Sequence, residues 1–151
     1  MGTLLYIKGD FENGLLHFNR ILEENENNVR ALLNKGLCCE QLSRDEEALA
    51  LYQKAVEIDP SFEKAVNNLA ICLDRKGDNE KAKEIFEAVL EKHPNNEKVL
   101  NNLGICFRKL CQNDEAIKQY QKALQINPNY SLAYFNLAVC LFDKVSLLTR
   151  I

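Results

Sequence analysis

Residues 97–130 read EKVLNNLGICFRKLCQNDEAIKQYQKALQINPNY and carry the clearest structural pattern in the chain. Its apolar residues recur at three- and four-residue steps, the period of one face of an α-helix. A first run contains Leu100, Leu103 and Phe107, and a second run is centred on Tyr120. The stretch therefore predicts two amphipathic helices joined by a short turn, with the proline near its end stopping the second helix.

The same pattern recurs along the chain with a fixed period. Pro60, Pro94 and Pro128 stand 34 residues apart, twice in succession. Shifting the sequence by that period matches small residues with small ones and aromatic residues with aromatic ones. Two matched sets are Tyr52, Phe86 and Tyr120, and Gly36, Ala70, Gly104 and Ala138. A constant period of this length indicates a helical repeat protein.

These positions resemble the signature of the tetratricopeptide repeat family, a 34-residue helix-turn-helix with bulky, small and aromatic places and a final proline. The residues of 97–130 at the signature places are Leu100, Leu103, Gly104, Phe107, Ala116, Tyr120, Ala123 and Pro128. The resemblance implies an all-α fold, an α-solenoid of helical hairpins wound into a right-handed superhelix.

The repeat register predicts a single solenoid domain over residues 1–151. Its full repeats are 29–62, 63–96 and 97–130. Residues 1–28 resemble the end of a first helix followed by a whole second helix, and 131–151 resemble a first helix alone. The chain thus begins and ends inside repeats without a polar cap, so we expect either a piece of a longer superhelix or ends that pair with another chain.

Composition limits the classes of function. A chain of 151 residues with 46% hydrophobic and 27% charged residues predicts one globular unit. Its net charge of −3 provides no general cationic field for nucleic acid or anionic lipid. Residues 1–11 do not read as a secretory leader, and no stretch of the sequence reads as a membrane-spanning run. We therefore expect a cytoplasmic protein, with the nucleus as the alternative.

The six cysteines are expected to be free thiols in a reducing compartment. Four of them follow the repeat at a place that the family fills with a small apolar residue: Cys38, Cys72, Cys106 and Cys140. Packed helices lie about 8–10 Å apart, beyond the reach of a disulfide, so these four should be buried and separate. Cys111 occupies the turn where Gly77 stands one repeat earlier, and it should be the most exposed thiol.

The sequence offers no arrangement of residues for catalysis. His17 and His93 lie in different repeats and are not spaced to pair with a nucleophile. General acid–base chemistry needs convergent groups, and neither a CxxC metal motif nor a phosphate-binding glycine loop is present. We predict a non-enzymatic protein without cofactor or metal.

Asparagines recur once per repeat in the predicted first helices, at Asn34, Asn68, Asn102 and Asn136. First helices line the concave side of such hairpin stacks. Because an amide can donate and accept, a column of asparagines could bind the backbone of an extended peptide. The column is similar to the asparagine ladder in the superhelical arm of O-GlcNAc transferase. The alternative is that these asparagines contact only solvent or a neighbouring turn.

Basic residues accompany this column and would make the groove attract acidic side chains, phosphate or a terminal carboxylate. The alternative is a scatter of solvated cations. The predicted peptide-contacting set is completed by Arg30, Lys64, Lys98, Arg75, Arg108 and Lys109, together with Asn67 and Asn101.

The sequence therefore predicts an adaptor or scaffold that binds peptide segments of other proteins. We expect no nucleic-acid or membrane partner. Two alternatives stay open. The chain could be the non-catalytic, substrate-selecting arm of a larger enzyme such as a glycosyltransferase, or a structural spacer that self-associates through its uncapped ends.

Residues that can accept hydrogen bonds stand at the starts of the predicted second helices. The predicted second helices open with Asp45, Asn79 and Asn113, whose side chains can accept from exposed backbone N–H groups. We expect them to act as helix caps.

Overall fold

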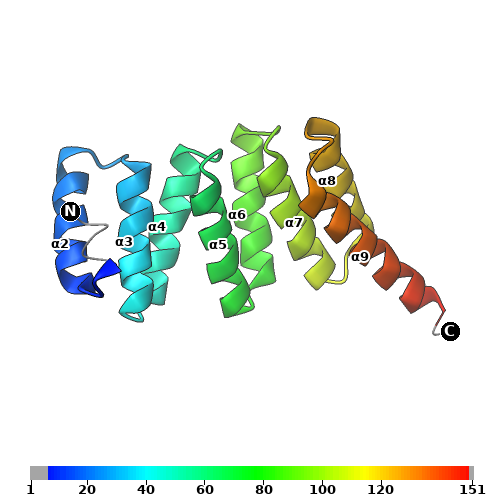
Figure 1. The fold of residues 1–151 in the computed structure, drawn as a ribbon. Coiled ribbons are helices and arrows are strands. Elements are labelled where there is room, and N and C mark those ends of the chain that lie inside the picture. The colour runs from blue at the N-terminus through cyan, green and yellow to red at the C-terminus, as the bar shows by residue number, and fades with distance from the viewer. Residues whose placement is uncertain (1–6, 150–151) are drawn as a thin grey trace. The chain divides into compact units, whose positions relative to one another are not determined.

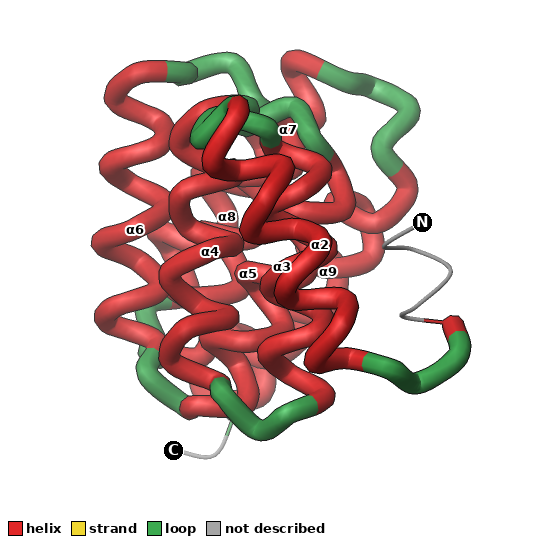
Figure 2. The backbone as a smooth tube through the Cα atoms, turned by 90° about the vertical axis from the view of Figure 1, so that its left-hand side faces the viewer, coloured by secondary structure: helices red, strands yellow, loops and turns green. Residues whose placement is uncertain are grey.

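The structure is a computed structural model and describes residues 7–149. In this part of the chain, helices are joined by short turns and no strand is present (Figures 1 and 2). The helices are α2 (Phe11–Glu24), α3 (Val29–Gln41), α4 (Asp45–Ile58), α5 (Glu63–Lys76), α6 (Asn79–Lys92), α7 (Glu97–Lys109), α8 (Asn113–Ile126) and α9 (Ser131–Leu148). The predicted all-α fold of consecutive helical hairpins is confirmed. The predicted end of a first helix before α2 lies mostly on residues 1–6, outside the described residues.

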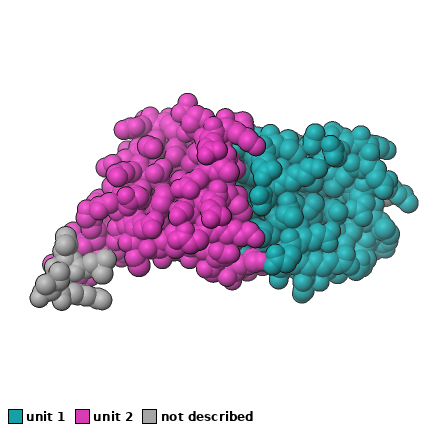
Figure 3. All heavy atoms as spheres, turned by 180° about the vertical axis from the view of Figure 1, so that it is seen from behind, with its two compact units in different colours: residues 1–72 teal, residues 73–151 magenta. Residues whose placement is uncertain are grey.

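The chain divides into two compact units, unit 1 over residues 1–72 and unit 2 over residues 73–151 (Figure 3). In unit 1, α3 packs against both α2 and α4. In unit 2, α6 packs on α7, α7 on α8, and α8 on α9, while α7 also contacts α9. The packing therefore joins helices that are close in sequence, as expected for a repeat protein.

Small residues bring the two helices of a hairpin into close contact. A Cβ atom added to Gly36 would lie 2.4 Å from Cε1 of Tyr52, and one added to Gly104 would lie 2.5 Å from Cε1 of Tyr120. Both tyrosines are fully buried. The small and aromatic places of the repeat thus face each other across the hairpin.

Prolines follow the second helices as predicted. The helices α4, α6 and α8 end at Ile58, Lys92 and Ile126, in each case two residues before the proline. The ring of proline cannot continue a helix, and the residue before it is pushed toward extended backbone.

The helices α4, α6 and α8 open with Asp45, Asn79 and Asn113 as predicted, although these three residues are not the caps. Each is the first helical residue, and the cap is the residue before it. Among the caps of α4, α6 and α8, only Asp78 accepts through its side chain, from the backbone N–H of Lys81 at 3.1 Å.

The turn geometry explains this shift. The turns before α4, α6 and α8 each contain one left-handed residue, Ser43 (φ 59°), Gly77 (φ 68°) or Cys111 (φ 60°). Each stands two positions before the first helical residue. Only one residue is left between the left-handed position and the helix, and that residue becomes the cap.

None of the helices within residues 7–149 combines the length and the hydropathy needed to cross a membrane.

Candidate peptide-binding surface on the first helices

In unit 1, the first helices present polar side chains at the predicted places. On α3, Arg30 is exposed and Asn34 is half-buried. On α5, Lys64 and Asn67 are exposed and Asn68 is half-buried. Amides and cations in such positions can form hydrogen bonds or ion pairs with a ligand at little desolvation cost.

In unit 2, the asparagines of α7 at the same repeat positions are buried. Asn101 is fully buried and Asn102 is only 9% exposed. The Nδ2 group of Asn136 on α9 donates to Oδ1 of Asn101 on α7 at 2.9 Å. These two amides therefore connect neighbouring first helices.

Two of the predicted ligand-binding cations are also paired within unit 2. Arg108 on α7 donates through Nη1 to Oδ2 of Asp143 on α9 at 3.1 Å. Lys109 forms an ion pair with Asp74, which lies in the last part of α5. Both pairs join residues 35 positions apart, so they connect equivalent parts of successive first helices.

The acidic partners of these cations were not predicted from the sequence. Asp74 and Arg108 occupy the same repeat position and carry opposite charges. Lys109 and Asp143 occupy the next repeat position and also carry opposite charges. That exchange of sign along the 34-residue period was the available signal. The remaining predicted cations are Lys98, which is half-buried, and Arg75, which is exposed.

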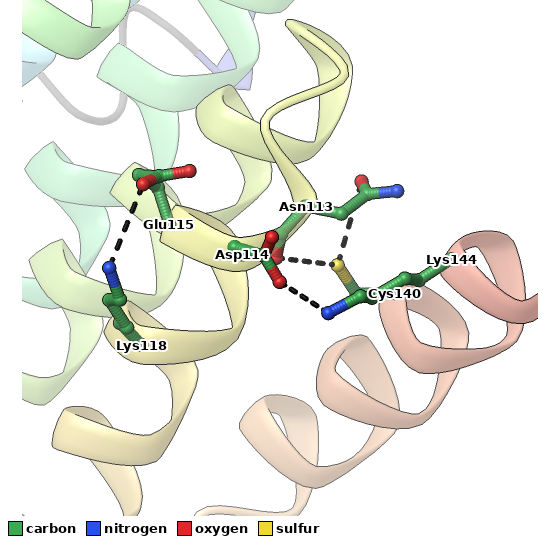
Figure 4. Close-up of polar contacts among 6 residues, drawn as sticks. All are labelled: Asn113, Asp114, Glu115, Lys118, Cys140 and Lys144. Carbon is green, nitrogen blue, oxygen red and sulfur yellow. Dashed lines mark hydrogen bonds and ion pairs between the residues drawn. The ribbon is translucent and has the colours of Figure 1, made fainter.

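Polar contacts also connect α8 with α9 (Figure 4). Lys144 forms an ion pair with Asp114, and the Cys140 thiol lies 3.6 Å from the backbone oxygen of Asn113. The ion pair lowers the pKa of Asp114, mainly through the hydrogen bond from Lys144. Both side chains of the ion pair are solvent-exposed. The pair should therefore contribute little to stability.

The predicted burial of the four periodic cysteines and the predicted exposure of Cys111 are confirmed. Cys38, Cys72, Cys106 and Cys140 are buried free thiols, and Cys111 is exposed. Burial raises the pKa of the Cys106 thiol to about 12. At neutral pH, Cys106 is therefore protonated and unsuited to nucleophilic chemistry.

The structure brings together no metal-binding cluster among the described residues. Within residues 7–149, no three side chains among His, Cys, Asp and Glu converge as a metal site would require. The surface of the first helices offers amides, cations and apolar side chains, which are groups suited to non-covalent binding.

Comparison with known proteins places these features in a family. Models described as tetratricopeptide repeat match residues 1–61, 44–103, 97–130 and 119–145. No curated protein sequence matches the chain. Several solved structures share its fold.

A crystal structure of MamA is 22% identical, with a TM-score of 0.68 over 95% of this chain and 84% of that one. A MamA structure from Desulfovibrio magneticus RS-1 is 19% identical, with a TM-score of 0.68 over 98% of this chain and 84% of that one. PilF from Pseudomonas aeruginosa is 19% identical, with a TM-score of 0.68 over 97% of this chain and 67% of that one. At this level of identity the likeness shows the fold alone. The chain belongs to the tetratricopeptide repeat family and carries several such repeats.

Proposed function

We propose that this protein is a non-catalytic adaptor that binds extended peptide segments of other proteins along its first helices. Tetratricopeptide repeats generally mediate contacts between proteins, which supports this class of function. The observation that carries the proposal is the polar surface of unit 1, where Asn34 and Asn68 stay partly accessible beside the exposed Arg30 and Lys64.

The proposed contacts centre on unit 1 because the equivalent groups of unit 2 have other roles. Asn101 and Asn136 are hydrogen-bonded to each other, and Asn102 is nearly buried. A peptide would have to replace the hydrogen bond between Asn101 and Asn136 to use both amides, which would cancel most of the gain. A ladder of four equivalent asparagines, as in the O-GlcNAc transferase arm, is therefore reduced here to Asn34 and Asn68.

The charges suggest the chemistry of the peptide. Arg30 and Lys64 are exposed cations on the same helices as the two asparagines. They favour a segment that carries Asp, Glu or phosphate next to a stretch of extended backbone. Each amide hydrogen bond contributes about 0.5–1.5 kcal/mol. Two asparagines and two cations therefore suit a peptide dissociation constant on the order of micromolar.

The test compares three forms of the protein as bait in lysate of the source organism: wild type, Asn34→Ala/Asn68→Ala, and Asn95→Ala/Asn129→Ala. Asn95 and Asn129 are exposed loop residues, so the last form controls for the loss of two surface amides. Proteins retained by wild type and control but lost from the Asn34/Asn68 variant would then be divided into overlapping peptides. Affinity for the binding peptide should fall at least about tenfold in the variant, the loss expected for roughly 1.4 kcal/mol. Equal affinity in all three forms, with unchanged circular dichroism, would reject the proposal.

A further inference from the structure

An aliphatic residue follows the periodic asparagine by three positions in four successive first helices. These residues are Leu37, Ile71, Ile105 and Val139, spaced by the 34-residue period. We call the two that lie in unit 1, Leu37 and Ile71, the aliphatic row. Ile71 is 57% exposed and Leu37 is half-buried. A single exposed aliphatic residue is common on protein surfaces, whereas one that recurs at the same place of successive repeats indicates a shared role.

The packing of α5 does not account for Ile71. The buried apolar face of this helix is formed by Ala65, Val66, Leu69, Cys72 and Leu73. Because a helix turns by about 100° per residue, Ile71 lies roughly 160° around the helix from both Leu69 and Leu73. Its exposed side chain is therefore directed away from the core and is available to a ligand.

The aliphatic row lies beside the amides and cations of the proposed peptide site. On α5, Lys64, Asn68 and Ile71 are separated by four and three positions, so each lies one helical turn after the one before. The equivalent residues on α3 are Arg30, Asn34 and Leu37. We call Arg30 and Lys64 the cation row. Along both helices, the surface of unit 1 thus presents a cation, an amide and an aliphatic side chain in successive turns.

An extended peptide bound by the amides would divide its side chains between the two flanking rows. In an extended chain, the side chains stand roughly perpendicular to the backbone N–H and C=O groups, and successive side chains point in opposite directions. With the backbone hydrogen-bonded to Asn34 and Asn68, one set of peptide side chains points toward the cation row. The other set points toward the aliphatic row.

Charge decides which set of side chains is acidic. The cation row attracts carboxylates. On the other side of the aliphatic row, Glu40 lies one turn after Leu37 and accepts a hydrogen bond from the Tyr52 hydroxyl at 2.8 Å. A peptide carboxylate on that side would be repelled by Glu40.

These observations specify the peptide more closely, on the basis of the proposed function. We propose that unit 1 recognises extended segments in which acidic and aliphatic side chains alternate. The acidic side chains bind the cation row, the aliphatic side chains bind the aliphatic row, and the asparagines hold the backbone between them.

The test uses three labelled synthetic peptides and measures their fluorescence anisotropy with the whole chain. Glutamate alternates with leucine in the first peptide and with serine in the second. The third has the composition of the first, with its glutamates and leucines in separate blocks. Wild type should bind the first peptide at least about tenfold more tightly than the second, because only leucine buries apolar surface against the aliphatic row. It should also bind the first more tightly than the third.

Ile71→Ser removes the exposed member of the aliphatic row. Its affinity for the glutamate–leucine peptide should fall at least about fivefold, while its affinity for the glutamate–serine peptide should stay that of wild type. The matched control is Ile58→Ser, the same substitution in unit 1 at a residue of α4 that is 38% exposed. This control should bind both peptides as wild type does, and circular dichroism should show equal helix content in all forms.

The inference fails if wild type binds the glutamate–leucine and glutamate–serine peptides equally, or if Ile71→Ser binds the former as tightly as wild type. Equal affinity for the alternating and the block peptide would also overturn it. The Asn34→Ala/Asn68→Ala protein separates this inference from the proposed function. If that protein loses both alternating peptides and Ile71→Ser loses neither, the amides bind peptide without help from the aliphatic row. A wild-type protein that binds none of the three peptides overturns the inference, and the lysate experiment then decides the proposed function alone.

Discussion

At the scale of single residues, the helix interior at Gly36 shows two opposing effects. Glycine costs about 1 kcal/mol relative to alanine in a helix, so propensity alone favours Gly36→Ala. The space does not allow the change, because the new Cβ would lie 2.4 Å from a ring atom of Tyr52. That ring is fully buried, and its hydroxyl donates to Glu40 at 2.8 Å. The ring cannot move without breaking this hydrogen bond and disturbing the core.

We expect Gly36→Ala to lower the free energy of unfolding by about 1–3 kcal/mol, the usual cost of overpacking a core. Urea denaturation followed by circular dichroism measures it. Gly14→Ala in α2 is the matched control, since its Cβ would meet only the Cys38 thiol, at 3.0 Å. Its loss should be clearly smaller. A Gly36→Ala protein that is more stable than wild type would show that helix propensity outweighs the contact with Tyr52.

At the scale of elements, each turn inside a hairpin contains one residue in the left-handed backbone conformation. Gly9, Ser43, Gly77 and Cys111 hold equivalent places, and all four have positive φ. Glycine adopts this conformation without steric cost, whereas other residues lose roughly 1–2 kcal/mol. The two non-glycine turns therefore carry strain that the two glycine turns lack.

We predict that Cys111→Gly raises the free energy of unfolding by about 0.5–1 kcal/mol, since relief of the strain exceeds the added entropy of the unfolded chain. Cys111 is exposed, so little packing is lost. Cys111→Ala removes the same thiol, retains the strain and should give no gain. Thermal melts of the three proteins under reducing conditions decide the matter, and equal gains in both variants would assign the effect to the thiol.

At the scale of the whole molecule, stability is expected to be local. The helix contacts of the described chain join neighbours in sequence, or first helices of successive repeats. In such arrays, stability is approximately a sum of repeat terms and nearest-neighbour terms. A destabilising substitution in one hairpin should therefore lower the stability of that hairpin and its neighbours more than that of distant hairpins.

Hydrogen exchange of the Gly36→Ala protein tests this expectation. Amides of α3 and α4 should exchange faster than in wild type, while those of α8 and α9 should keep their protection. Measurement by mass spectrometry at peptide resolution is sufficient. An equal loss of protection in α8 and α9 would show that the whole chain unfolds as one cooperative unit.

The repeats, the helices and their pairing could be predicted from the sequence alone. The 34-residue period, the apolar steps around Leu100 and Leu103 and the repeated prolines are local signals, because a hairpin of two amphipathic helices is specified by residues close in sequence. The burial of the four periodic cysteines and the exposure of Cys111 followed from the same register. Helix caps were misplaced by one residue, since a left-handed turn residue is hard to recognise when it is serine or cysteine.

The tertiary structure alone decided which polar residues of the first helices remain available to a ligand. Asn34 and Asn102 occupy the same repeat position, yet the first is half-buried and the second only 9% exposed. The sequence pattern placed Arg108 in a ligand groove, whereas contact between α7 and α9 sets it against Asp143. Periodicity assigns a residue to a face of its helix, but the packing of the neighbouring helix determines whether that face is covered or open.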